Sequence, residues 1–365
     1  MDSVSVVMPL YNHECYVEES IFSVINQNYP VLELIVIDDG SSDNSGEIVK
    51  KNNDSRVKYV FQENKGAHDA INKALSLSKG KYIAIINSDD VYHPSRIEKC
   101  LESIKCDTSI DAVFSSVDYI DDKSKYLNTV IGAEENWQGK EAGNSFASSR
   151  QLTLDLLAGN FIKTTSNLFC RAECFDKVGL FRNLRYTHDY DFFLRLSSQC
   201  KVKFIEEPLL KYRVHPGNTL KEDQAAVDFE CALVISNFLM NHDLSKIIDP
   251  ELPDSMSKLL NSLNTHRAER VMLVFAIFAG YMGDKEQLFL SILDDPDHPF
   301  RKAGRDFICN YHDGWQAREE IYQEWHKLHA MYVQSEEQLQ QAERSLGYRI
   351  EKKIRYYLNK MTGSI

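Results

Sequence analysis

The run Val4-Ser5-Val6-Val7-Met8-Pro9-Leu10, the segment Tyr16–Asn26 with helical spacing, and the apolar run Leu32–Ile37 together decide the fold of this chain. Apolar runs without strict alternation are typical of strands buried on both faces, and an intervening helix joins such strands in parallel. The same order continues with a helix at Asn44–Lys51, a strand at Val57–Phe61, a helix at Ala67–Leu77, a strand at Tyr82–Ile86, a helix beginning near Pro94 and a strand at Ala112–Val117. We therefore expect an α/β fold whose mostly parallel, Rossmann-like sheet is flanked by helices.

Two acidic clusters follow strands of this predicted sheet. Asp38-Asp39-Gly40-Ser41 closes the second strand, and Asn87-Ser88-Asp89-Asp90 closes the fourth. In open α/β sheets ligands bind beyond the carboxyl ends of the strands. Asp89 and Asp90 offer the oxygen ligands that Mg²⁺ or Mn²⁺ needs, and Asp39 offers an acceptor for a base or ribose. The alternative for both clusters is a turn whose polar residues cap the next helix.

Composition limits the classes of function. The 365 residues suffice for two domains, and a hydrophobic content of 43% can fill a sizeable core. The formal net charge of −12 argues against nucleic-acid binding, which needs clustered Lys and Arg. A nucleotide can still bind if a divalent metal lies between carboxylate and phosphate. No basic region followed by an apolar stretch opens the chain, so we expect a cytoplasmic protein.

The second half of the chain divides into segments of different character. Glu134–Ser149 is rich in Gly, Asn, Ser and charge, which predicts a mobile loop. A helix is expected from near His188 and a strand at Val202–Ile205. The predicted domains are 1–221, a helical extension at 222–330 and an amphipathic helix or linker at 331–365. That last helix fits a dimerising coiled coil, a membrane-surface helix, a linker or a solvated structural helix.

The chain resembles the inverting GT-A glycosyltransferases of glycosyltransferase family 2 over roughly residues 1–220. The motifs that carry the resemblance are, in order, Val6-Val7-Met8-Pro9-Leu10-Tyr11-Asn12, Asp38-Asp39-Gly40-Ser41-Ser42-Asp43, Asn64-Lys65-Gly66, Asn87-Ser88-Asp89-Asp90, His188-Asp189-Tyr190-Asp191 and Tyr212-Arg213-Val214-His215-Pro216-Gly217. The resemblance implies a GT-A fold and a metal-dependent transfer, of the hexosyltransferase type, from a nucleotide-diphosphate sugar.

The resemblance also implies roles for residues of the donor half. The donor nucleotide would contact Pro9, Tyr11, Asn12, Asp39, Lys65 and Asp89. The metal, Mn²⁺ or Mg²⁺, would bind Asp90 with help from Asp89, and His215 would complete its shell. The family often has Asp where this chain has Asn87, so one carboxylate of the motif is missing.

For the acceptor half, the resemblance makes Asp189 the catalytic base. An inverting transfer needs one carboxylate to take the acceptor hydroxyl proton as that oxygen attacks the anomeric carbon. His188 stands where the family usually has Glu, and Asp191 is the competing base. On a helix, residues 189 and 191 point in different directions, and we favour Asp189. Further acceptor or phosphate contacts are expected from His188, Asp191, Arg185 and Arg213, with Arg182 beside them.

The function expected from these residues is inverting transfer of a sugar to a hydroxyl of a glycan or lipid-linked glycan. A UDP-sugar is favoured over a dTDP-sugar, and bacterial surface polysaccharide such as O-antigen or capsule is the implied product. Peripheral contact with the inner face of the cytoplasmic membrane, or self-association, would involve the last helix. A non-catalytic nucleotide-sugar scaffold is the alternative. A sugar nucleotidyltransferase is disfavoured because Pro9-Leu10-Tyr11-Asn12 is no Gly-rich phosphate loop.

Overall fold

The computed structural model describes residues 2–130, 149–242, 285–298 and 301. The chain comprises two compact units, Met1–Ala268 and Glu269–Ile365, and helix α11 (Lys285–Asp294) is the described element of the second. The predicted loop up to residue 148 and the final amphipathic helix lie outside the described residues. The predicted boundaries after residues 221 and 330 stay predictions. In the described parts of the chain, no helix is long and apolar enough to cross a membrane.

One sheet organises the first unit. Strand β1 (Val4–Leu10) lies between β2 (Glu33–Asp39) and β4 (Tyr82–Ile85), and β3 (Val57–Gln62) lies outside β2, all in parallel. The strand order is β3-β2-β1-β4-β8-β6-β9-β5, with β7 paired to β6. The other bounds are β5 Val91–Tyr92, β6 Ala112–Ile120, β7 Tyr126–Val130, β8 Phe169–Arg171 and β9 Val202–Arg213.

Strand direction brings distant segments to one edge of the sheet. Because β8 runs antiparallel to both β4 and β6, β6 points the same way as β1, and β9 is parallel to β6. The carboxyl ends of β1, β2, β3, β4, β6 and β9 therefore meet at one edge. The prediction of a mostly parallel sheet is confirmed.

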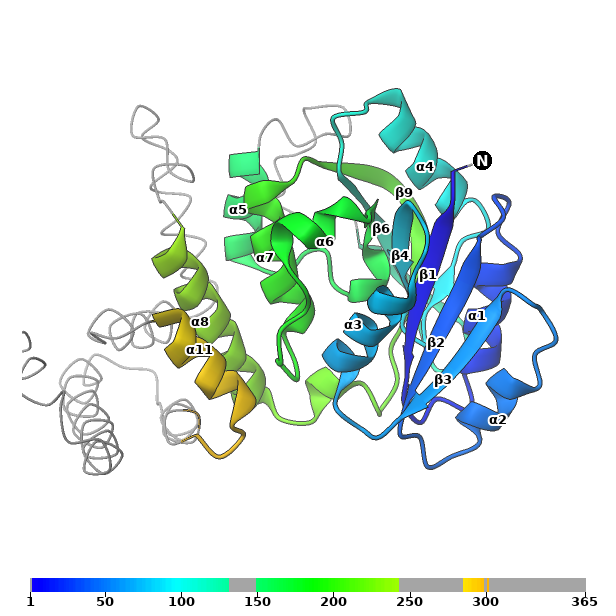
Figure 1. Cartoon of the computed structure of the whole chain (residues 1–365), viewed down its shortest axis with the longest axis horizontal. Helices are drawn as coiled ribbons and strands as arrows, with labels where there is room; N and C mark the ends of the chain where they lie inside the picture. Colours follow the sequence, from blue (N-terminus) through cyan, green and yellow to red (C-terminus); the bar gives the residue numbers. More distant parts are fainter. Residues whose placement is uncertain (1, 131–148, 243–284, 299–300, 302–365) are drawn as a thin grey trace, which may run out of the picture. The chain divides into compact units, whose positions relative to one another are not determined.

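Helices cover both faces of the parallel half (Figure 1). Helices α1 (Val17–Ile25) and α2 (Ser45–Lys50) lie on one side, and α3 (Ala67–Leu77) lies on the other. Right-handed crossovers require this, because the chain moves outward from β1 to β3 and then returns past β1 to β4. Helix α4 (Arg96–Cys106) packs on β6 and β9.

The core lies between these layers. Every residue of β1 and β2 is buried, which explains their apolar runs without alternation. Helix α1 places Val17, Ile21 and Val24 on its inner face, at the spacing of one helical stripe. Burying each such side chain stabilises the fold by roughly 1.5–3 kcal/mol.

The region after β6 is richer in structure than the sequence predicted. Helices α5 (Ser149–Ala158) and α6 (Glu173–Val178) were not predicted, and β9 extends eight residues beyond the predicted Ile205. The cause is the polar interruption Glu206-Glu207-Pro208, where the β6–β9 register shifts and both strands continue beyond the irregularity. Helix α7 (His188–Gln199) begins at the predicted place and contacts α5, α6 and α8 (Gln224–Asn241).

Candidate active site

The carboxyl end of β2 is tied to the loop before α3 through Asp39. Its Oδ1 accepts hydrogen bonds from Gln62 Nε2 at 2.7 Å and the Lys65 backbone N–H at 2.9 Å, and its Oδ2 accepts from the Gly66 N–H at 2.8 Å. Gly66 has φ +92°, a conformation that favours glycine. Asp39 is only 3% exposed, and its carboxylate oxygens stabilise the conformation of this loop. Its contact with a nucleobase stays a prediction.

The other predicted donor residues surround this strand end. Pro9 is buried within β1 and pairs with Ile37 of β2. Asn12 has φ 52°, and its Oδ1 accepts from the Ser42 N–H at 2.8 Å, which joins the ends of β1 and β2. Tyr11 is 49% exposed and Lys65 is also exposed. An accessible aromatic ring and an accessible ammonium group thus flank a rigid, hydrogen-bonded edge.

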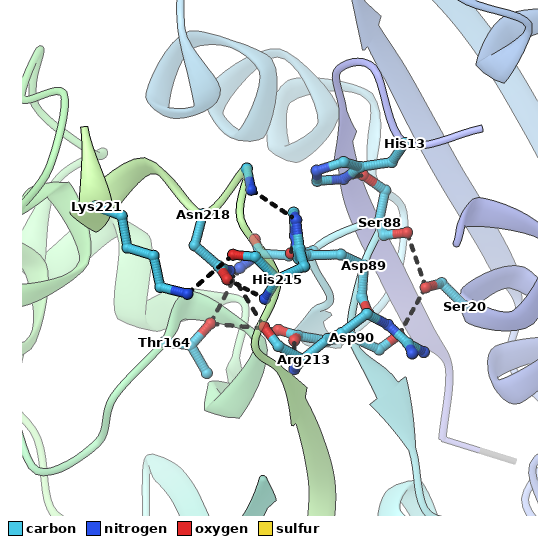
Figure 2. Close-up of polar contacts among 12 residues, drawn as sticks. His13, Ser20, Ser88, Asp89, Asp90, Thr164, Arg213, His215, Asn218 and Lys221 are labelled. Atoms are coloured by element: carbon cyan, nitrogen blue, oxygen red, sulfur yellow. Dashed lines mark hydrogen bonds and ion pairs between the residues drawn. The ribbon is translucent and has the colours of Figure 1, made fainter. Parts of the chain in front are cut away.

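A second cluster combines residues from the ends of β1, β4 and β9 (Figure 2). His215 Nε2 lies 3.0 Å from Asp89 Oδ2, and the ring centroids of His13 and His215 are 5.5 Å apart. One ligand atom from each of His13, Asp89 and His215 lies within 4.8 Å of the others. Within the described residues, this is the group of three whose donor atoms converge closely enough to hold a metal ion.

The electrostatics of the cluster favour an ionised Asp89 and a neutral His13, which are the forms that bind a cation. Burial raises the pKa of Asp89, but the hydrogen bond with His215 and the electrostatic interactions with His13 and His215 outweigh this effect, so the pKa of Asp89 is lowered. Burial lowers the pKa of His13, which therefore keeps a neutral ring. His215 Nδ1 accepts from the Gly217 N–H at 3.2 Å, which leaves Nε2 as the His215 nitrogen that faces Asp89. A metal ion bound at this Nε2 would take the place of its proton.

Asp90 points away from this cluster, into the protein. Its Oδ2 accepts from Ser166 Oγ at 2.5 Å, and its Oδ1 accepts from the Arg213 backbone N–H at 3.0 Å. Asp90 is fully buried, and burial together with the charge of Asp89 raises its pKa well above the ordinary value. The sequence made Asp90 the main metal ligand and Asp89 its helper, whereas the geometry favours the reverse order.

Arg213 is also used inside the protein. Its guanidinium is 1% exposed and donates to the Asp89 carbonyl at 2.7 Å and to Glu19 at 2.7 Å. It also lies over the ring of Tyr16, 4.9 Å from its centroid. This buried, paired position does not support the predicted contact of Arg213 with phosphate or acceptor. Arg213 instead holds the turn that presents Asp89.

The substitution at Asn87 has a structural account. Its Nδ2 donates to Thr164 Oγ1 at 3.0 Å, and its Oδ1 accepts from Thr165 Oγ1 at 2.9 Å. A carboxylate at this position could accept the hydrogen bond from Thr165, but it could not donate one to Thr164 as the amide does. The missing Asp of the family motif is therefore replaced by an amide that fits its neighbours.

The predicted base Asp189 lies in the first turn of α7. Its Oδ1 accepts from the Tyr190 N–H at 2.7 Å, and its Oδ2 accepts from Asn160 Nδ2 at 3.1 Å. Its side chain stays partly accessible, yet burial raises its pKa to about 7. Tyr212 of β9 interacts electrostatically with Asp89, Asp90 and Asp189, so one side chain senses both the acidic residues after β4 and the predicted base.

The competing carboxylate, Asp191, forms ion pairs with two arginines. Arg195 contacts its Oδ2 at 2.6 Å and Arg182 contacts its Oδ1 at 3.1 Å, and Asp191 is 3% exposed. This arrangement does not support a contact between Asp191 and the acceptor.

His188 packs edge-on against Phe181, and burial lowers the pKa of His188 to about 4. Arg185 is exposed and pairs with Glu222 at 2.7 Å. The acceptor roles of His188 and Arg185 stay predictions.

Replacing Asp191 with asparagine is expected to destabilise the protein. Removing one partner of a buried ion pair leaves the other charge uncompensated, at a cost of about 3 kcal/mol or more. Urea unfolding of the variant measures this loss. Glu47→Gln, which breaks the exposed pair with Lys50, is the matched control and should leave the midpoint unchanged. An Asp191→Asn protein as stable as the wild type would contradict the structural role.

Sequence reasoning missed His13 as a candidate ligand. It directly follows the motif that ends in Asn12, and a histidine at a strand end beside two acidic clusters was the available signal. What the sequence could not show is that β9 returns to pair with β5, the strand that directly follows Asp89 and Asp90. That return brings His215 close to both His13 and Asp89.

The sequence is similar to those of known glycosyltransferases. A model of glycosyl transferase family 2 matches residues 5–175. The chain is 33% identical to an uncharacterized glycosyltransferase of Rickettsia prowazekii over 218 residues, which are 59% of this chain and 65% of that protein. The chain thus spans slightly less than two thirds of that relative's length. It is 30% identical to glycosyltransferase GlyG of Streptococcus pneumoniae over 229 residues, 60% of this chain and 73% of that protein.

A solved structure confirms the fold. The crystal structure of S. aureus TarS 1-349 in complex with UDP-GlcNAc superposes with a TM-score of 0.58 at 17% identity, covering 91% of this chain and 92% of that one. At this identity the likeness shows the fold alone, which is the predicted GT-A fold. Given its motifs, its site and these relatives, the chain belongs to glycosyl transferase family 2.

Proposed function

We propose that this glycosyltransferase moves a sugar from a UDP-sugar to a hydroxyl of a glycan or lipid-linked glycan, with inversion at the anomeric carbon and with a divalent metal. The proposal rests on a potential metal cluster and a carboxylate of raised pKa that both interact electrostatically with Tyr212 of β9. The cluster is His13, Asp89 and His215, and the carboxylate is Asp189.

The metal cluster supports a role in stabilising the leaving group. A divalent cation bound there would offset the negative charge that develops on the departing nucleotide diphosphate. Two imidazole nitrogens and one carboxylate oxygen fit a transition ion such as Mn²⁺ better than Mg²⁺, which prefers a shell of oxygen ligands. We therefore favour Mn²⁺.

Asp189 supports the inverting step. Its carboxylate takes the proton of the acceptor hydroxyl while that oxygen forms a bond to the anomeric carbon. The bond between this carbon and the phosphate oxygen breaks on the opposite face, and its electron pair leaves with the nucleotide diphosphate. A base with a pKa of about 7 is half ionised near neutral pH and still takes up a proton readily.

The nucleotide and the acceptor are proposed on different grounds. S. aureus TarS, which shares the fold, has been crystallised with UDP-GlcNAc, and this favours UDP over dTDP for our chain. Synthesis of bacterial surface polysaccharide is the pathway that we propose, in keeping with the bacterial relatives. Peripheral contact with the cytoplasmic membrane rests on the last helix, which lies outside the described residues.

Thermal unfolding with nucleotides tests the donor site. A ligand that binds only the folded protein stabilises it by RT ln(1 + [L]/Kd), about 2.7 kcal/mol at 100 times Kd. We expect UDP with Mn²⁺ to raise the midpoint by several degrees, and dTDP, GDP or CMP to raise it less. If no nucleotide shifts the midpoint, with or without Mn²⁺, the donor site is wrong and the scaffold alternative gains. A larger shift with dTDP would replace UDP in the proposal.

A further inference from the structure

One carboxylate outside the family motifs binds the segment that precedes the proposed base. Glu230 lies on α8, in the region that the sequence treated as a separate helical extension. Its Oε2 accepts hydrogen bonds from the backbone N–H groups of Tyr186 at 2.8 Å and Thr187 at 3.1 Å, and its Oε1 accepts from the Arg185 N–H at 3.1 Å. Three successive backbone donors thus converge on one side chain.

The hydrogen bonds of Glu230 are buried, which strengthens them. It is 1% exposed, so these bonds form away from water and to an ionisable acceptor, where a hydrogen bond is strong. The hydroxyl of Thr187 adds a fourth bond to Oε2 at 3.2 Å. Thr187 directly precedes α7 as its N-cap residue, and its own side chain does not cap the helix. Glu230 therefore fixes the start of α7 from outside.

The base lies two residues beyond this anchor. The Thr187 carbonyl accepts from the Asp191 N–H at 2.9 Å, which closes the first turn of α7 around Asp189. The Asp189 carboxylate is in turn oriented by the Tyr190 N–H at 2.7 Å. A shift of residues 185–187 is transmitted through this turn to the position of the Asp189 oxygens.

We infer that Glu230 is a positioning residue for transfer: it holds the start of α7 so that Asp189 meets the acceptor hydroxyl, and α8 is therefore part of the catalytic unit. The inference rests on the proposed function, because Asp189 is the base there. It goes beyond it by assigning a role in catalysis to the segment after residue 221, for which the sequence offered no chemistry.

Substitutions at Glu230 test its positioning role, because such a role predicts a lower kcat with an unchanged Kd for UDP. Misplacing a catalytic group by about 1 Å costs on the order of 100-fold in rate. We expect Glu230→Ala to lower kcat about 100-fold and Glu230→Gln, which keeps one acceptor oxygen, to lower it about 10-fold, with little change in the Kd for UDP. Asp228→Asn, which removes a carboxylate from the same helix where it accepts from Gln224 at 3.0 Å, is the matched control with kcat unchanged.

Two further readouts distinguish positioning from mere stability. Loosening the start of α7 admits water to Asp189, so the pH midpoint of kcat should move to lower pH in Glu230→Gln. Hydrogen exchange at the amides of residues 185–187 should speed up in the same variant, and this holds whether or not the protein transfers sugar. A wild type without transfer activity overturns the proposed function. Unchanged exchange, or an unchanged kcat and pH midpoint in a folded variant, overturns the role of Glu230.

Discussion

Replacing Asp189 with asparagine is expected to lower kcat for sugar transfer by about 10³-fold. General base catalysis by a positioned side chain contributes roughly 10²–10⁴-fold, and an amide cannot take the acceptor proton. Tyr190 and Asn160 donate the hydrogen bonds that hold this side chain, and neither residue belongs to the metal cluster. Rates with labelled UDP-sugar should therefore fall while the Kd for UDP stays constant. A variant with wild-type kcat would remove Asp189 from the mechanism.

The pH dependence of the wild type follows from the same group. Because the pKa of Asp189 is raised to about 7, the base is ionised above pH 7 and protonated below it. We expect kcat to reach a plateau above about pH 7.5 and to fall tenfold per pH unit below about pH 6.5. The titratable groups that interact with Asp189 are Tyr190, Tyr212 and Cys231. Burial raises the pKa of each, so none of them ionises near pH 7.

The Asp189→Asn substitution should stabilise the folded protein at alkaline pH. In the unfolded chain an aspartate ionises near pH 3.8, whereas the folded protein holds Asp189 protonated up to about pH 7. The free energy of unfolding therefore decreases as pH rises between these values, and above pH 7 the buried charge exerts its full cost. Asparagine removes that cost, so urea unfolding at pH 8 should show a gain of ~2 kcal/mol, roughly half of what a fully buried group would give.

Replacing Asp89 with asparagine is expected to abolish high-affinity Mn²⁺ binding and to lower kcat by about 100-fold or more. The carboxylate is the only anionic ligand of the cluster, and an amide oxygen is a far weaker ligand for a divalent cation. Mn²⁺ titration followed by electron paramagnetic resonance, with UDP present, measures the affinity directly.

Asp90→Asn is the comparison that decides between adjacent carboxylates. Its oxygens are held by Ser166 and the Arg213 backbone, so we expect this variant to bind Mn²⁺ nearly as well as the wild type, with lower stability. If Asp90→Asn loses Mn²⁺ and Asp89→Asn retains it, the order predicted from the sequence is right and the geometric one is wrong.

The fold was predictable where one physical signal dominated. β1 and β2 are buried on both faces, so their apolar runs identify them, and the helix between them, α1, carries one apolar stripe. The signal failed where tertiary pairing overrides composition. β5 has two residues, and β9 continues through Glu206, Glu207 and Pro208 because its partner β6 supplies the hydrogen bonds. Local sequence does not contain that information.

The site was predictable as a set of residues but not as a set of contacts. The motifs named Asp39, Asp89, Asp189 and His215, and all four lie at the expected sheet edge or the start of α7. Neighbours in sequence turned out to have opposite uses, since Asp89 faces His215 whereas Asp90 faces Ser166. Direction at a turn depends on backbone angles, which pattern and spacing do not fix.

The position of β9 between β6 and β5 also sets an order of events during biosynthesis. His13 and Asp89 belong to the part of the chain that emerges first from the ribosome, but His215 follows the last residue of β9. The cluster can close only after β9 has paired with β6, a contact between segments far apart in sequence that forms late. A nascent or truncated chain that ends before β9 would lack His215. A metal ion held by all three residues of the cluster would therefore report that the sheet has been finished.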